Sequence, residues 1–188
     1  MNKRTITLIE LILAIVLLGV IILSATAIDV ASRYFFKSSD TKVQVLNEVS
    51  FILEHIQKNA SQATGWIDDP GFKLLSSTQL LIRQDANNPP TPGDFTDDTW
   101  IEYRRQGNNF RFSPDGGTNW ETLSSRIVDN PDIDGDGFPE PVFSLSPSGT
   151  EVIVTLTARY DPSASLDSKT NPEVSLQTRL FLGEHSFN

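Results

Sequence analysis

The hydrophobic residues of this chain begin with one long uncharged run. Residues 11–28 read LILAIVLLGVIILSATAI, an 18-residue segment without a charged side chain. A helix of that length rises about 27 Å, which is close to the thickness of the hydrocarbon core of a bilayer. The pattern therefore predicts a helix that enters a membrane.

Beyond this run the apolar residues take up helical spacing. Intervals of three and four residues separate Leu46, Val49, Leu53, Ile56 and Ala60, and charged or polar residues occupy most of the opposite face. This pattern predicts an amphipathic helix that ends near residue 63. If the helix were continuous from residue 6, it would extend about 58 residues, or about 87 Å. The segment Ser38-Ser39-Asp40 offers an alternative, because Ser and Asp cap new helices.

The remainder of the chain alternates short apolar segments with turn residues, which is typical of antiparallel strands. Proline and aspartate predict a surface loop over residues 85–98, and Pro147-Ser148-Gly149 predicts a hairpin turn. The expected fold class is α+β: a long N-terminal α-helix packed on an antiparallel β-sheet head. The expected strands are residues 79–83, 100–104, 110–112, 141–145, 151–159 and 174–182.

Composition excludes several classes of function. The chain has 15 basic and 24 acidic residues, a net charge of −9, so we expect no nucleic-acid partner. It contains no cysteine, which excludes thiol catalysis and Cys-ligated metals, and only two histidines, His55 and His185. No residue pattern indicates a catalytic arrangement, so we do not expect an enzyme.

Charges around the apolar run predict its orientation. Lys3 and Arg4 precede the run and Asp29 follows it. The positive-inside rule then keeps the short N-terminus in the cytoplasm and places the rest of the chain across the membrane. Two ordinary interpretations of such a run are a secretory signal peptide, with Ala25-Thr26-Ala27 as its cleavage site, and a plain uncleaved anchor. Neither accounts for Glu10, a carboxylate at the start of the run.

The segment Ile6-Thr7-Leu8-Ile9-Glu10-Leu11-Ile12 resembles the start of mature type IV pilins and type II secretion pseudopilins, which reads Phe-Thr-Leu-Ile-Glu-Leu. The resemblance implies that a prepilin peptidase cuts between Thr5 and Ile6 and methylates the new amino group. Thr5 stands where the family usually has Gly, and Ile6 replaces Phe.

The resemblance also implies how the protein acts. It would be a single-pass inner-membrane protein, with its head outside the cytoplasm, that assembles with other pilin or pseudopilin subunits into a pilus or pseudopilus. In the filament, Glu10 would pair with the α-amino group of Ile6 on a neighbouring subunit. The implied segments are a leader (1–5), a transmembrane and filament-core helix (6–28), an amphipathic helix (29–63) and a β-rich head (64–188).

The order of segments in the head resembles one branch of that family, the minor pilins and pseudopilins of the W and J type. An arginine-bearing strand is followed by segments that leave the sheet and return to it. The resemblance favours a minor subunit over the main filament subunit. It rests on residues 103–105, 110–112, 122–128, 152–157 and 176–182.

An acidic stretch near residue 135 is the candidate metal site. Carboxylates at alternate positions before a glycine resemble calcium loops outside the EF-hand class, and hard oxygen donors suit Ca²⁺. A calcium ion would stiffen the head rather than catalyse a reaction. The alternative is an acidic turn whose side chains bond their own backbone. The candidate ligands are Asp132, Asp134, Asp136, the backbone carbonyl of Phe138, and Glu140, with Asp129 as an alternative.

A second loop, Ser113-Pro114-Asp115-Gly116-Gly117-Thr118-Asn119-Trp120, resembles the Asp-box. In that motif the Asp bonds the turn backbone and the Trp packs beneath it, so we expect a rigid turn. The single copy argues against a sialidase propeller. The sequence leaves one alternative to a filament subunit: an exported or membrane-anchored calcium-dependent binding domain.

Overall fold

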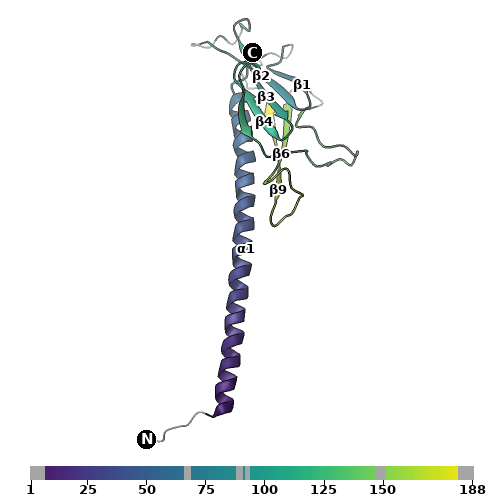
Figure 1. Cartoon of the computed structure of the whole chain (residues 1–188). Helices are drawn as coiled ribbons and strands as arrows, with labels where there is room; N and C mark the ends of the chain where they lie inside the picture. The colour runs from purple at the N-terminus through teal and green to yellow at the C-terminus, as the bar shows by residue number, and fades with distance from the viewer. Residues whose placement is uncertain (1–6, 66–68, 88–90, 92–93, 147–150, 182–188) are drawn as a thin grey trace.

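A computed structural model describes residues 7–65, 69–87, 91, 94–146 and 151–181. One helix, α1 (Leu8–Ala60, 53 residues), forms a rod about 80 Å long, and the strands gather around its C-terminal part (Figure 1). We call residues 61–181 the head. The predicted α+β class, with a long N-terminal helix and antiparallel strands, is confirmed.

The helix passes through residues 38–40 without a break, so the alternative of a second helix starting there is wrong. The hydroxyl of Thr41, just after this segment, donates to the carbonyls of Lys37 (3.1 Å) and Ser38 (3.0 Å) in the same helix, so a polar side chain here is satisfied without ending the helix. The helix ends three residues earlier than expected. Ala63 already pairs with Gln84 as an isolated β-bridge, which takes the backbone out of the helix.

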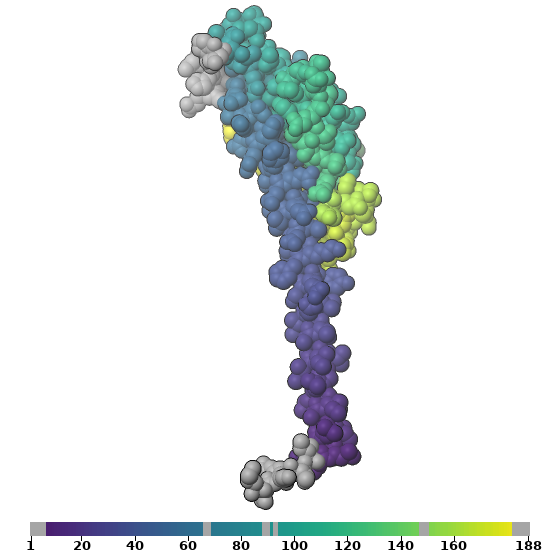
Figure 2. Space-filling view, turned by 60° about the vertical axis from the view of Figure 1, so that its left-hand side comes forward, coloured from purple at the N-terminus to yellow at the C-terminus, as the bar shows by residue number. Residues whose placement is uncertain are grey.

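The first half of α1 packs against no other element of the described chain. Its large apolar side chains from Leu8 to Phe36 are at least half exposed, and Figure 2 shows most of this part of the helix standing clear of the head. The segment is long and apolar enough to span a membrane or to act as a signal sequence. The structure therefore agrees with the prediction of a membrane-entering helix to that extent.

The second half of α1 buries one stripe against the head. Leu46, which the spacing argument placed in this stripe, is 39% exposed, whereas its neighbour Val45 is fully buried. Adjacent helical residues point about 100° apart, and Val45 continues the line of Val49 and Ile52, so Leu46 points partly away from the sheets. The buried positions are Thr41, Val45, Val49, Ile52, Leu53, Ile56 and Ala60.

Five strands form an antiparallel meander in which sequence neighbours pair throughout. Its core-facing side is apolar, as in the cross-strand pair of Leu80 and Tyr103. The sequence did not predict the first or the last of these strands. They are β1 (Phe72–Ser76), β2 (Gln79–Gln84), β3 (Thr99–Gln106), β4 (Asn109–Ser113) and β5 (Glu121–Ser124).

A second antiparallel sheet is built around β8 (Glu151–Arg159), which pairs with β6 (Ile127–Val128), β7 (Phe143–Leu145) and β9 (Glu173–Phe181). The antiparallel pairing of β7 with β8 confirms the strands of the predicted hairpin, although its turn, residues 147–149, lies outside the described residues. Of these strands, β6 was not predicted.

One core joins α1 to both sheets. Its largest fully buried side chains are Tyr103, Phe110 and Phe143, and the second half of α1 supplies the buried stripe. The sheets cover only the second half of the helix. The apolar first half therefore extends from the packed head without contacting the sheets.

Candidate functional site

The bare end of α1 carries Glu10. Its carboxylate accepts hydrogen bonds from the backbone N–H (2.8 Å) and the hydroxyl (3.0 Å) of Thr7, and Thr7 Oγ1 accepts from the Glu10 N–H (3.4 Å). This reciprocal arrangement is a capping box, which satisfies the free N–H groups of a helix start. Within the subunit, the Glu10 carboxylate is therefore hydrogen-bonded to Thr7. The predicted cleavage bond between Thr5 and Ile6 lies outside the described residues.

The surroundings of Glu10 are apolar and open. Leu8, Ile9 and Leu11 are 77%, 69% and 53% exposed, and among the described residues only Thr7 bonds to the Glu10 carboxylate. The Glu10 carboxylate can accept further hydrogen bonds. When the helix packs among others, it can therefore form a charged hydrogen bond with an ammonium group of another molecule.

The acidic loop connects β6 to β7 and extends from the side of the head (Figure 1). Carboxylate oxygens of Asp132, Asp134 and Asp136 lie within 4.8 Å of one another. Oxygens that share one Ca²⁺ at 2.3–2.6 Å can be separated by up to about 5 Å, so this donor set fits a hard cation. The structure brings these three candidate ligands together.

The same carboxylates also bond their own loop. Asp132 accepts from the N–H of Gly135 (2.7 Å) and of Gly137 (2.9 Å), and Asp136 accepts from the N–H of Phe138 (2.8 Å). Both glycines have positive φ, 80° and 89°, which favours glycine over other residues. The hydrogen-bonded acidic turn is therefore present, and each carboxylate retains acceptor capacity for an ion.

The other candidate ligands behave differently. The Glu140 side chain reaches back to the loop, where Oε1 accepts from the N–H groups of Ile133 (3.2 Å) and Asp134 (3.3 Å). Asp129 instead pairs with Arg105 at 2.7 Å, which argues against it as a ligand. The ring of Phe138 is 71% exposed, and no contact of the structure bears on the carbonyl role predicted for it.

The base of the acidic loop is fixed by Asn130, which is 4% exposed. Its amide donates to the carbonyls of Glu140 (3.1 Å), Pro141 (3.3 Å) and Thr155 (3.0 Å). These bonds tie both ends of the loop to the neighbouring strand β8. The loop is accordingly held at its base, while its acidic tip is exposed.

The loop from Ser113 to Trp120 forms the rigid turn that its motif predicts. Asp115 Oδ1 accepts from the hydroxyl of Ser113 (2.8 Å) and the N–H groups of Thr118 (3.1 Å) and Asn119 (2.7 Å). These bonds, led by that of Asn119, lower the pKa of Asp115 to about 2. The indole N–H of Trp120 donates to a backbone carbonyl of the turn at 2.9 Å, so the ring closes the loop.

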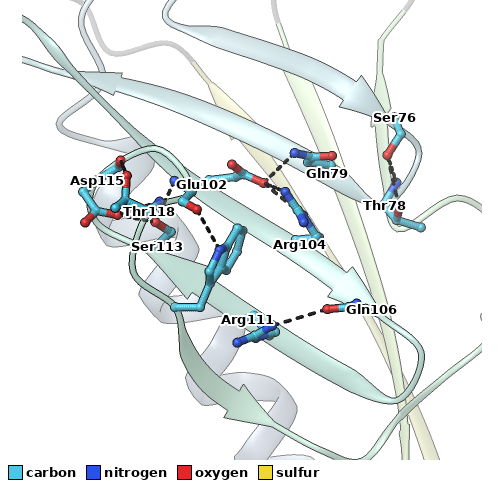
Figure 3. Close-up of polar contacts among 12 residues, drawn as sticks. Ser76, Thr78, Gln79, Glu102, Arg104, Gln106, Arg111, Ser113, Asp115 and Thr118 are labelled. Atoms are coloured by element: carbon cyan, nitrogen blue, oxygen red, sulfur yellow. Dashed lines mark hydrogen bonds and ion pairs between the residues drawn. The ribbon is translucent and has the colours of Figure 1, made fainter.

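This turn covers a polar cluster on the outer face of the meander (Figure 3). Glu102, 3% exposed, accepts from Gln79 (2.5 Å) and from Arg104 (2.8 Å), and the Arg104 guanidinium lies 4.5 Å from the Trp120 ring. Arg111, directly opposite Arg104 on the next strand, forms no ion pair in the described chain. The cluster pairs the buried charge of Glu102 and holds the turn in place.

His55 has a structural environment. It is half-buried, its Nδ1 lies 2.8 Å from the hydroxyl of Tyr103, and Phe112 packs edge-on against it. Desolvation lowers the pKa of His55, and burial raises that of Tyr103. Both groups are therefore uncharged at neutral pH and act as a hydrogen-bonded link between α1 and β3.

One feature escaped the sequence analysis altogether: a groove between α1 and the loop that joins β8 to β9. The aromatic and basic segment that follows the apolar run, Arg33 to Lys37, was a signal for it on the helix side. Its other wall comes from residues 167–170, and nothing in the local sequence there indicates contact with α1.

Comparison with known proteins finds no matching family model, curated protein or solved structure. Three features of the geometry bear on function: the exposed apolar helix that begins at the Thr7–Glu10 capping box, the packed head at its other end, and the acidic loop.

Proposed function

We propose that this chain is a minor pilin or pseudopilin, a structural subunit of a type IV pilus or type II secretion pseudopilus. The observation that carries the proposal is a single unbroken helix: its first half is apolar and exposed, with Glu10 at its start, and its second half packs one face against the head. A helix built this way can stay in the membrane until assembly and then exchange contact with lipid for contact with other helices.

Glu10 is the assembly residue in this proposal. In a filament core, pairing with the α-amino group of Ile6 on a neighbour replaces the solvent around the carboxylate and fixes the axial register. The capping box supports this role, because it holds the Glu10 side chain at the helix end where a neighbour's terminus would meet it. The partners are other pilin or pseudopilin subunits and the prepilin peptidase.

The continuity of α1 argues against a secreted form. Cleavage after Ala27 would cut the helix in the middle and leave residues 28–40 as a terminal segment with little packing, since most of that segment is exposed. A retained helix instead places the head outside the cytoplasm on an inner-membrane anchor, in the orientation that Lys3 and Arg4 predict.

Intact mass of the membrane-extracted protein tests the processing step. Loss of residues 1–5 with one added methyl group supports the proposal, whereas loss of residues 1–27 refutes it. Assembly is tested by Glu10→Ala, which we expect to abolish incorporation into filaments. Glu54→Ala, an exposed acid on the head-bearing half of α1, is the matched control. Undiminished incorporation of the Glu10 variant would refute the role of this residue.

The acidic loop favours a second candidate, a membrane-anchored or exported calcium-dependent binding domain. The observation behind it is the set of three carboxylates within 4.8 Å on a loop that the head holds at its base. The mass measurement separates the candidates, because a binding domain requires neither cleavage after Thr5 nor methylation.

A further inference from the structure

A groove of about 570 Å³ lies between α1 and the loop that joins β8 to β9. The helix contributes Ala31, Tyr34, Phe35 and Lys37, and the loop contributes Lys169 across from them. Figure 2 shows this loop, in yellow-green, against the middle of the helix. Tyr34 and Phe35 are each 70% exposed, so the described chain leaves the apolar floor of the groove open.

The loop wall is held by its own hydrogen bonds. Asn171, 5% exposed, donates from its amide to the carbonyls of Asp161 (2.9 Å) and Ser165 (3.0 Å). Arg159 donates to the carbonyl of Ala164 at 3.1 Å. Backbone bonds between Asp167 and Asn171 close the tip at 2.8 and 3.3 Å. Lys169 therefore lies in a turn whose backbone is held by hydrogen bonds.

The position of the groove along α1 corresponds to the membrane surface. About 20 helical residues cross the hydrocarbon core, so a span that begins at Leu11 reaches its far edge near Ala31. Lys37 then lies about 9 Å beyond that edge, at the level of lipid headgroups. Tyr34, three residues beyond that edge, is of a residue type that is enriched at membrane interfaces.

The charges in the groove favour an anion. The ammonium groups of Lys37 and Lys169 form no ion pair in the described chain. Asp167, the carboxylate on the groove wall, accepts from the N–H of Lys169 (2.8 Å) and the hydroxyl of Thr170 (2.9 Å), and these bonds, with a smaller effect of the Lys169 charge, lower its pKa. The groove thus combines an open apolar floor with two ammonium groups and one satisfied carboxylate.

We propose that this groove binds one anionic phospholipid from the leaflet on the head side of the membrane, with its phosphate held by Lys37 and Lys169, its glycerol beside Tyr34 and Phe35, and its acyl chains entering the hydrocarbon core at Ala31. The inference rests on the part of the proposed function that keeps α1 in the membrane. The bound lipid fixes how the head is rotated over the bilayer, and it leaves the groove when the helix is extracted into a filament.

The test uses the full chain reconstituted into nanodiscs that contain equal amounts of phosphatidylglycerol and phosphatidylcholine. Lipid that stays bound after gentle detergent extraction is counted by native mass spectrometry. We expect one phosphatidylglycerol per chain for the wild type, and a loss of about 5-fold for each of Lys37→Gln and Lys169→Gln. Lys73→Gln, on an exposed position of β1, is the matched control and should retain the lipid.

Equal retention by the wild type and the Lys37→Gln, Lys169→Gln double variant would overturn the inference, as would equal retention of the two lipids. Formation of dimers with no bound lipid would also overturn it, because a second copy would then fill the groove. These results leave the proposed function intact. A chain that alkaline extraction releases from the membrane refutes the membrane anchor, and with it both proposals.

Discussion

The buried stripe of α1 leads to a quantitative prediction about Ile52. This side chain is fully buried between the helix and the sheets, whereas Leu46, six residues earlier, is 39% exposed. Replacing a buried isoleucine with alanine removes its transfer free energy and leaves a cavity, at a cost of about 3 kcal/mol. For a cooperative unit of this size, that corresponds to a fall in Tm of about 9 °C.

The matched variant is Leu46→Ala, which removes a similar side chain from a half-exposed position and should cost less than about 1 kcal/mol. Alanine is the strongest helix former, so neither substitution weakens the helix itself. The assay is thermal unfolding of the detergent-solubilised full chain, followed by tryptophan fluorescence, since the described tryptophans lie in the head.

The two variants distinguish the observed stripe from the one that the spacing alone predicted. If Leu46→Ala lowered Tm as much as Ile52→Ala, the helix would be rotated relative to the sheets and the argument from burial would be wrong. A small effect of both would mean that the second half of α1 does not hold the head.

Three other predictions concern the head. Added calcium should raise Tm, and replacing Asp134 and Asp136 with Asn should remove that rise; an unchanged Tm with calcium in the wild type contradicts the site. Tyr103→Phe should cost about 1–2 kcal/mol in thermal unfolding, because the Asn59 amide loses its 2.7 Å acceptor. The pKa of Asp115 is lowered to about 2, so its stabilising effect is complete above about pH 4 and is lost as pH falls towards 2. NMR titration of its carboxyl carbon measures this pKa, and a value in the usual range for aspartate would contradict the prediction.

The sequence predicted those elements whose signal is local. The uncharged run, the helical spacing that follows it and the strand predicted over residues 151–159 each depend on neighbouring residues, and the structure has a helix and a strand there. The turn around Asp115 was equally predictable, because its hydrogen bonds join residues at most four positions apart. The clustering of Asp132, Asp134 and Asp136 was predictable for the same reason, because these residues are at most four positions apart.

Other features were decided by contacts between distant segments. The spacing predicted Leu46 in the buried stripe, whereas packing against the sheets buries its neighbour Val45 instead. Strand β1 was missed because five residues carry little periodicity, and it is its pairing with β2 that defines it as a strand. The processing bond and the filament contacts of Glu10 depend on other molecules, so they remain predictions.

The sequence by itself determined that one end of this chain is a bare apolar helix and the other a β-rich head, because periodicity and charge are properties of neighbouring residues. Only the tertiary structure decided which helix face the sheets cover, and only it placed Lys169 and Lys37 on the walls of one groove. The physical reason is that these two lysines are separated by most of the chain, and the fold of both sheets must form before their charges share one groove.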